Sequence, residues 1–208
     1  MMRQLVWRLA VVVTLVLVLA GCASAPSRPA PTDPVSSAPQ VSKRALEAAR
    51  VRAGIADCPR SGDQPALSGG LPDVTLGCLG GSRTVRLSAL RGRPMVINIW
   101  AQWCGPCRME APHLAAVARQ AGDKVEFIGI DYADPNPSAA IEFARVAGWR
   151  YPQLQDQRQL VKGPLKIIGV PQTFLVDADG RIVYRQVKPL SSATQLRQLI
   201  RDHLGVGL

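Results

Sequence analysis

The stretch Trp103-Cys104-Gly105-Pro106-Cys107 decides the fold of this chain of 208 residues. An apolar run at 95–100 precedes it and predicts a buried strand, and apolar residues at spacings of three and four follow it and predict a helix. A cysteine at a helix start ionises readily, because the helix dipole and free N–H groups favour an anion. Cys107 lies three residues after Cys104 and can resolve a mixed disulfide. The pattern therefore predicts a redox-active dithiol.

A Cys-x-x-Cys pair can instead be half of a zinc site. Such a site takes a second pair or two nearby histidines. The chain has two histidines, His113 and His203, and neither is suitably spaced from the cysteines. His113 is six residues after Cys107 and so points about 120° away from it on an ideal helix. The sequence favours redox chemistry, with no metal and no cofactor other than the Cys104–Cys107 disulfide.

The first 21 residues predict a lipoprotein signal peptide. Arg3 and Arg8 form a basic start, and the apolar run at 9–20 is short for a transmembrane helix. The sequence Leu19-Ala20-Gly21-Cys22 resembles a bacterial lipobox, in which Cys22 carries the lipid. An uncleaved anchor is the alternative interpretation. Both place the rest of the chain on the extracytoplasmic side of the cell membrane.

The remainder divides into a tether and one domain. Residues 22–65 begin with Cys22 and a proline-rich stretch, which is typical of an extended linker. A short helix could follow, beginning at Ser42 and ending at Gly54. Residues 66–208 are numerous enough for a single hydrophobic core.

The composition is basic, with a formal net charge of +10. Removing residues 1–21 removes two arginines and no acids, which leaves +8. A basic surface would be attracted to an anionic bilayer, although a basic composition without a specific partner is the favoured interpretation. Basic residues do not alternate with aromatic ones in a stripe, so nucleic acid is not expected as a partner.

The five cysteines predict a second disulfide. Setting aside Cys22 leaves four, which allow three pairings. If Cys104 pairs with Cys107, then Cys58 pairs with Cys78, and an extracytoplasmic location permits such a bond. We expect this second disulfide to be structural, and a redox role for it is the alternative.

The predicted elements alternate between strands and helices. A hairpin at 71–90 precedes the strand at 95–100 and the helix that carries the cysteines. A strand at 125–130, a helix from Asn136 to Gly148, strands at 173–176 and 182–184, and a helix starting at Ser191 or Ser192 follow. This order predicts an α/β fold: a mixed central sheet with helices on both faces and an N-terminal β-hairpin extension.

Three motifs together resemble one family. They are residues 98–107, Glu110-Ala111-Pro112, and Gly169-Val170-Pro171-Gln172-Thr173-Phe174. They are similar to the thioredoxin fold, and more closely to the membrane-anchored TlpA/ResA-like thiol–disulfide oxidoreductases. The resemblance covers about residues 70 to 204.

The resemblance assigns roles to single residues. Cys104 matches the exposed nucleophile and Cys107 the resolving thiol. Pro171 matches a cis-proline that faces the dithiol and turns the backbone of Val170 toward an extended substrate. The substrate-binding residues that the resemblance implies are Trp103, Gly105, Pro106, Val170 and Pro171.

Glu110 matches an acid that this family keeps near the dithiol. It lies three residues after Cys107, on the same helix face, and could carry the proton of that thiol. A solvated surface glutamate is the alternative. Cytosolic thioredoxins have an aspartate six positions before the first cysteine, whereas this chain has Asn98, which cannot titrate.

The resemblance implies exchange of disulfides with exported proteins. A reductant would reduce proteins such as apocytochrome c with electrons from a membrane partner, and an oxidant would form disulfides. The dipeptide Gly105-Pro106 favours a reductant near about −270 mV, by analogy with thioredoxin. A peroxidase on this fold requires a threonine where this chain has Ala101. A copper chaperone on this scaffold uses Cys-x-x-x-Cys and a later histidine, which the chain does not match.

Overall fold

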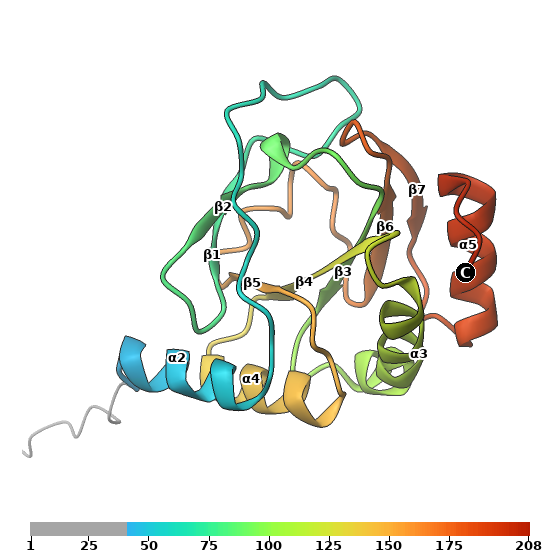
Figure 1. Ribbon diagram of the computed structural model, residues 1–208. Helices are drawn as coiled ribbons and strands as arrows, with labels where there is room; N and C mark the ends of the chain where they lie inside the picture. Colours follow the sequence, from blue (N-terminus) through green and yellow to red (C-terminus); the bar gives the residue numbers. More distant parts are fainter. Residues whose placement is uncertain (1–40) are drawn as a thin grey trace, which may run out of the picture. The chain divides into compact units, whose positions relative to one another are not determined.

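The computed structural model describes residues 41–208 (Figure 1). The predicted signal peptide, Cys22 and the proline-rich stretch lie outside the described residues. The helices are α2 (Lys43–Arg52), η1 (Leu87–Ala89), α3 (Gly105–Ala121), α4 (Pro137–Val146) and α5 (Ala193–Leu204). The strands are β1 (Thr75–Cys78), β2 (Thr84–Arg86), β3 (Met95–Trp100), β4 (Glu126–Tyr132), β5 (Gln153–Asp156), β6 (Gln172–Val176) and β7 (Ile182–Gln186).

The strands form one mixed sheet in the order β2-β1-β5-β4-β3-β6-β7. β3 pairs in parallel with β4 and antiparallel with β6, and β4 pairs in parallel with β5. Every residue of β3 is buried, as its largely apolar sequence, interrupted only by Asn98, predicts for a central strand covered on both faces. The fold is thioredoxin-like, and the predicted hairpin β1–β2 extends the sheet at one edge.

β5 was not predicted from the sequence. Its residues Gln153, Gln155 and Asp156 are polar, and Pro152 precedes them, so no apolar run marks the strand. Gln153 is nevertheless completely buried, because its side-chain oxygen accepts a hydrogen bond from the Trp100 indole at 3.0 Å and its amide donates to the Tyr151 carbonyl at 3.2 Å. β5 then joins the hairpin to the central sheet through β1.

A glycine on β4 makes room for the contact between Trp100 and Gln153. A Cβ atom at Gly129 would overlap the Gln153 side chain and come within 2.8 Å of the Trp100 indole nitrogen. Only glycine therefore fits beneath this buried hydrogen bond without displacing it.

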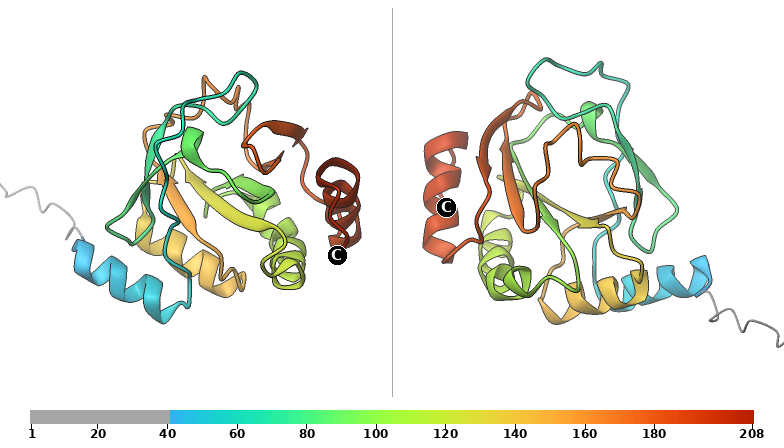
Figure 2. Two further views of the ribbon diagram at one scale, coloured as in Figure 1. Left: turned by 45° about the horizontal axis from the view of Figure 1, so that its top comes forward. Right: turned by 180° about the vertical axis from the view of Figure 1, so that it is seen from behind.

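Among residues 41–208, the α-helices α3, α4 and α5 lie on one face of the sheet and the other face carries only the short 3₁₀ helix η1, which corrects the expectation that long helices cover both faces. Buried residues of α3, α4 and α5, including Leu114, Ile141 and Leu196, share one core cluster with Val96 and Trp100 of β3. The opposite face, with Ile97 and Ile99, is covered by η1 and by segments without long helices (Figure 2). The chain passes from β3 to β4 to β5 in one direction, so right-handed crossovers place α3 and α4 on the same face.

The predicted helix starts are confirmed by their capping contacts. The side chains of Ser42, Asn136 and Ser192 each accept a hydrogen bond from a backbone N–H in the first turn of α2, α4 and α5. Pro137 occupies the first helical position of α4, where a missing N–H costs no hydrogen bond.

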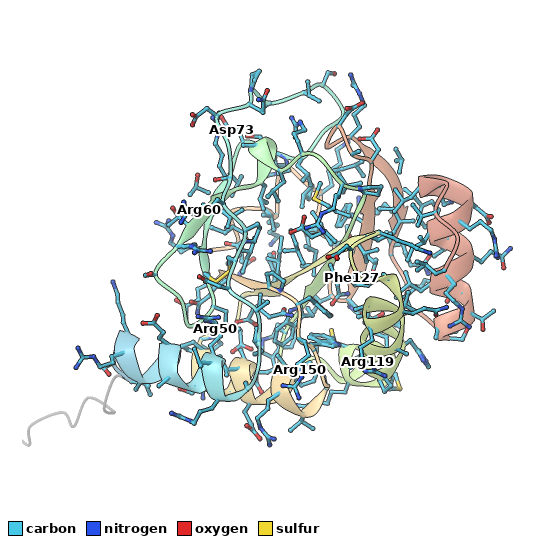
Figure 3. The ribbon with its side chains drawn as sticks, in the orientation of Figure 1. Arg50, Arg60, Asp73, Arg119, Phe127 and Arg150 are labelled. Carbon is cyan, nitrogen blue, oxygen red and sulfur yellow. A yellow bond between two sulfur atoms is a disulfide. The ribbon has the colours of Figure 1, made fainter. Side chains whose placement is uncertain are left out.

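The basic residues come from many elements. The labelled arginines in Figure 3 lie on α2, on the segment after it, on α3 and after α4. Several pair with acids, as Arg86 does with Asp73 and Arg145 with Glu142. This spread agrees with a basic composition better than with one binding stripe.

Candidate active site

The two central cysteines lie where β3 passes into α3. Cys104 is the N-cap residue of α3, with extended backbone angles, and its Sγ accepts a hydrogen bond from the Cys107 N–H at 3.1 Å. A disulfide joins Cys104 to Cys107. The position that precedes a helix favours negative charge, so the geometry supports a thiolate at Cys104 after reduction.

The sulfur-bearing residues are less exposed than the resemblance implies. Cys104 is 3% exposed and Cys107 is fully buried, because both belong to the core cluster beneath α3. Their neighbours form the accessible surface: Gly105 and Pro106 are exposed, and Trp103 is 53% exposed. The small exposed area of the pair belongs to Cys104, so an approaching group reaches that residue first.

The peptide bond between Val170 and Pro171 is cis, as the resemblance implies. β6 begins at the next residue, and Gln172 pairs with Ile99 in an antiparallel register. Continuing this register places Pro171 beside Trp100, at the end of β3 that leads to Cys104. Pro171 itself is buried, whereas Val170 is half-buried.

Glu110 is a buried residue of α3, so it is not the solvated surface glutamate of the alternative interpretation. It is 1% exposed. Its Oε1 accepts a hydrogen bond from Asn98 Nδ2 at 3.0 Å, and its Oε2 accepts one from the Leu190 N–H at 2.8 Å. Asn98 also donates to Thr173 Oγ1 at 3.3 Å. The carboxyl group therefore connects α3 to β3 and to the segment before α5.

The environment of Glu110 tunes its proton affinity. Burial raises the pKa of this carboxyl from 4.5 to about 7, against the opposing effect of the hydrogen bonds from Leu190 and Asn98. A group with such a pKa can take up and release a proton near neutral pH.

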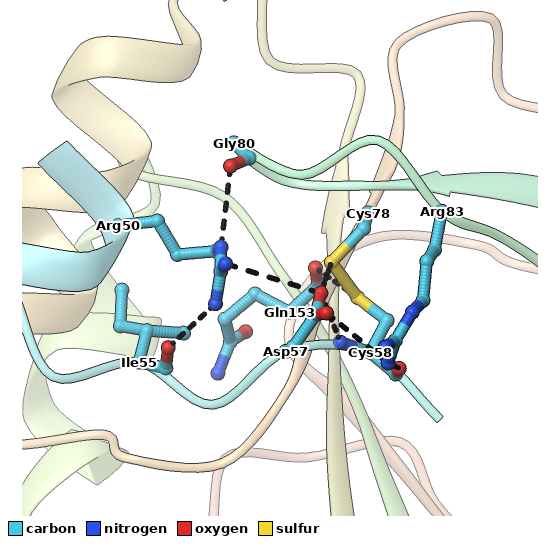
Figure 4. A network of polar contacts seen from close by, with 8 residues as sticks. All are labelled: Arg50, Ile55, Asp57, Cys58, Cys78, Gly80, Arg83 and Gln153. Atoms are coloured by element: carbon cyan, nitrogen blue, oxygen red, sulfur yellow. Dashed lines mark hydrogen bonds and ion pairs between the residues drawn. A yellow bond between two sulfur atoms is a disulfide. The ribbon is translucent and has the colours of Figure 1, made fainter. Parts of the chain in front are cut away.

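Cys58 and Cys78 form a disulfide 20 positions apart, at the centre of a polar network (Figure 4). Cys58 is fully buried, and the Cys58 carbonyl accepts a hydrogen bond from Arg83 at 2.8 Å. Asp57 pairs with Arg83 at 3.1 Å, and its Oδ1 lies 3.7 Å from Cys78 Sγ. Arg50 of α2 donates to the carbonyl groups of Gly80 and Ile55 (Figure 4). The network and the disulfide fasten the segment after α2 to β1.

Two further acids lie beside the site and were missed in the sequence. Asp131 is the next-to-last residue of β4, and Asp134 follows in the loop before α4; both are fully buried. Asp134 accepts a hydrogen bond from the Gln102 N–H, two residues before Cys104. The sequence signal for Asp131 is its position directly after the apolar run at 125–130, which predicts a buried strand. An acid at the end of such a strand indicates a specific role, because acids are rarely buried without one.

Two properties of residues 41–208 bear on the remaining expectations. Within this part of the chain, no cluster of three or more metal-binding side chains is present. None of its helices has the length and apolar composition needed to cross a membrane.

Comparisons with known proteins agree with this site. The profile of the AhpC/TSA family matches residues 69–185. The chain is 30% identical over 146 residues to thiol:disulfide interchange protein DsbE of Allochromatium vinosum, covering 69% of the chain and 77% of that protein. It is 30% identical over 136 residues to thiol-disulfide oxidoreductase ResA of Geobacillus thermodenitrificans, covering 64% and 73%.

A solved structure shares the fold. A secreted disulfide oxidoreductase of Mycobacterium tuberculosis superimposes with a TM-score of 0.53 at 25% identity. The match covers 61% of the chain and 91% of that structure.

Proposed function

The chain belongs to the AhpC/TSA family and is a thiol–disulfide oxidoreductase, and from that premise we propose that it reduces disulfides of exported proteins outside the cytoplasm. Apocytochrome c before haem attachment is the substrate that we favour. The single observation that supports the proposal best is the Cys104–Cys107 pair at the N-terminus of α3. A membrane partner would return electrons to this pair.

In the proposed reaction Cys104 attacks and Cys107 resolves. The Cys104 thiolate bonds to one sulfur of the substrate disulfide, and the other substrate sulfur leaves as a thiolate. Cys107 loses its proton to Glu110 and attacks Cys104 Sγ, which releases the second substrate thiolate. Two electrons pass to the substrate, and the protein is left with the Cys104–Cys107 disulfide. The surface that holds the substrate would be formed by Trp103, Gly105, Pro106, Val170 and Pro171.

The alternatives have less support. A peroxidase would need a hydroxyl three residues before the attacking cysteine, and Ala101 supplies none. An oxidant uses the same residues as a reductant, so a measurement must separate the two directions.

The reduction potential of Cys104–Cys107 tests the direction. We expect about −270 mV, the thioredoxin value, because the same Gly-Pro dipeptide separates the cysteines. The potential would be measured against glutathione in the wild type and in a Cys58→Ala/Cys78→Ala variant, in which only one disulfide can titrate. A potential of about −120 mV, typical of the strong oxidant DsbA, would instead show that the protein forms disulfides in its substrates.

Replacing Glu110 with glutamine should change both stability and exchange. The folded protein holds the Glu110 proton up to about pH 7, whereas the unfolded chain releases it near 4.5. The stability due to this proton is therefore fully present below about 4.5 and is lost as pH rises to about 7, by about 3 kcal/mol. Denaturant unfolding at several pH values should show a slope between pH 4.5 and 7 that is shallower in Glu110→Gln than in the wild type, because the part that Glu110 contributes is missing. Exchange near neutral pH should also slow, because glutamine cannot accept the Cys107 proton.

The control for this experiment is Glu142→Gln, which changes an exposed glutamate on α4. It should keep the wild-type slope between pH 4.5 and 7. A wild type and a Glu110→Gln variant with parallel stability curves would show that Glu110 does not titrate in this range.

Cys22 is proposed to carry the lipid that anchors the protein to the membrane. The support is Leu19-Ala20-Gly21-Cys22 after a short apolar run. Cys22→Ser should lose incorporation of a labelled fatty acid, whereas Ser24→Ala should keep it. Labelled fatty acid on the Cys22→Ser protein would contradict the lipid anchor.

A further inference from the structure

Asp131 is fully buried, and no group among residues 41–208 donates a hydrogen bond to either oxygen of its carboxyl. Its neighbours across the sheet are Trp100 on β3 and Gln155 on β5, which do not ionise. The charged group that acts on it is Asp134. An ionised Asp131 would therefore be a buried charge without compensation.

Asp134 is held in the opposite way, with a donor on each oxygen. Its Oδ2 accepts a hydrogen bond from the Gln102 N–H at 3.0 Å, and its Oδ1 accepts one from the Asn136 N–H at 2.9 Å. Gln102 is thereby joined to the residue that caps α4.

Gln102 is also held from its other side. Its carbonyl accepts a hydrogen bond from the Arg108 guanidinium, which lies 5.0 Å from the centre of the Phe143 ring on α4. Residues 101–104 form a turn in which the Cys104 N–H donates to the Ala101 carbonyl at 3.1 Å. Two charged side chains, Asp134 and Arg108, therefore fix the peptide groups on both sides of Gln102, two residues before the attacking cysteine.

Two buried carboxyl groups that interact rarely both carry a charge near neutral pH. Both oxygens of Asp134 accept backbone hydrogens, whereas those of Asp131 accept none, so Asp131 is the carboxyl that would keep a proton and donate it to Asp134. Burial, then the charge of Asp134 and the hydrogen bond between them, raise the pKa of Asp131 to about 9.

We propose that Asp131, as a neutral acid, and Asp134, as its ionised partner, are positioning residues that hold Gln102 and so aim Cys104 for attack. The proposal rests on the function proposed above, in which Cys104 is the nucleophile. Loss of the Asp131 proton would place two like charges side by side and push Asp134 from Gln102. The pair would thus set an alkaline limit on the reactivity of Cys104.

The test measures how fast the reduced protein attacks dithiobis(nitrobenzoic acid) between pH 6 and 10. Each rate is divided by the fraction of Cys104 that is thiolate at that pH. Asp134→Asn should be about tenfold slower at pH 7, because an amide cannot accept both backbone hydrogens. Asp131→Asn keeps a neutral donor to Asp134 and should stay within about twofold of wild type at pH 7. The wild-type rate should decline above about pH 9, and Asp131→Asn should not decline. Asp123→Asn, a fully exposed acid, is the control.

Two spectroscopic measurements on the wild type make the test independent of whether the variants fold. The Asp131 carboxyl carbon resonance should be that of a protonated acid at pH 7. Hydrogen exchange of the Gln102 amide should be protected at pH 7 and should lose protection, beyond the intrinsic pH effect, above about pH 9. An ionised Asp131 at pH 7, or equal pH profiles for wild type and Asp131→Asn, would overturn the proposal.

A Cys104→Ser variant separates this proposal from the proposed function. If Cys104→Ser keeps the reactivity, Cys104 is not the nucleophile and the proposed function fails. If Cys104→Ser loses it while a folded Asp134→Asn reacts at the wild-type rate, only the positioning role fails.

Discussion

A Cys107→Ser variant is expected to accumulate mixed disulfides with its protein partners, and Cys104→Ser is expected to accumulate few. Cys104 lies at the N-terminus of α3, where a thiolate is favoured, and it supplies the small exposed area of the pair. Without Cys107 no thiol remains to release the bound partner, so the trapped fraction should rise at least about tenfold over Cys104→Ser. Non-reducing gels followed by mass spectrometry would measure the trapped species and identify the partners.

The matched control is a double variant, Cys104→Ser/Cys107→Ser, which should trap nothing. Equal trapping by the two single variants would contradict the assignment of attacking and resolving roles. Disulfide reductase activity should fall to background in all three variants, and wild-type activity in any of them would remove Cys104–Cys107 from the reaction.

Removing the second disulfide should cost about 3 kcal/mol of unfolding free energy in a Cys58→Ala/Cys78→Ala variant, since the bond closes a loop of 20 positions. The segment after α2 would keep its contacts through Arg50, Asp57 and Arg83, so the protein should still fold. Urea unfolding under oxidising conditions would measure the difference, with the single variant Cys58→Ala for comparison.

The same disulfide should persist while Cys104–Cys107 is reduced. Burial alone does not distinguish the two bonds, because Cys78 is 5% exposed and Cys104 is 3% exposed. Their neighbours differ: Cys104 Sγ accepts a backbone N–H, whereas Asp57 Oδ1 lies 3.7 Å from Cys78 Sγ and disfavours the thiolate that reduction would leave. Peptide mapping at a potential that reduces Cys104–Cys107 should find Cys58 and Cys78 still joined, and free thiols at both would refute a purely structural role.

Local sequence signals were sufficient for the central part of the fold. The apolar run of β3, the capping residues of the helices and the Cys-x-x-Cys spacing are each readable within a few residues, and they locate the dithiol at a strand-to-helix junction. Glu110 could be nominated from its spacing to Cys107. The burial of Glu110 could not be predicted, because its hydrogen-bond partners are Asn98 on β3 and Leu190, which is 80 positions from Glu110.

The features that were missed depend on tertiary contacts. β5 is a polar strand whose buried polar side chains are satisfied from outside it. Trp100 donates to Gln153, and backbone N–H groups of the segment after β5 donate to Asp156. The placement of α3 and α4 on one face follows from the position of β5, which continues the direction from β3 to β4. The roles of Asp131 and Asp134 depend on a loop brought to them by β3, and no spacing within their own segment reveals it.

The Cys58–Cys78 bond also determines what a single protease cut would do to the chain. Most residues between 60 and 69 are exposed, so a protease would cut there first. Cys58 precedes that stretch and Cys78 follows it, so the disulfide would keep a chain cut there as one covalent molecule. The N-terminal piece would stay attached to the catalytic part, so the lipid anchor proposed at Cys22 would survive such a nick.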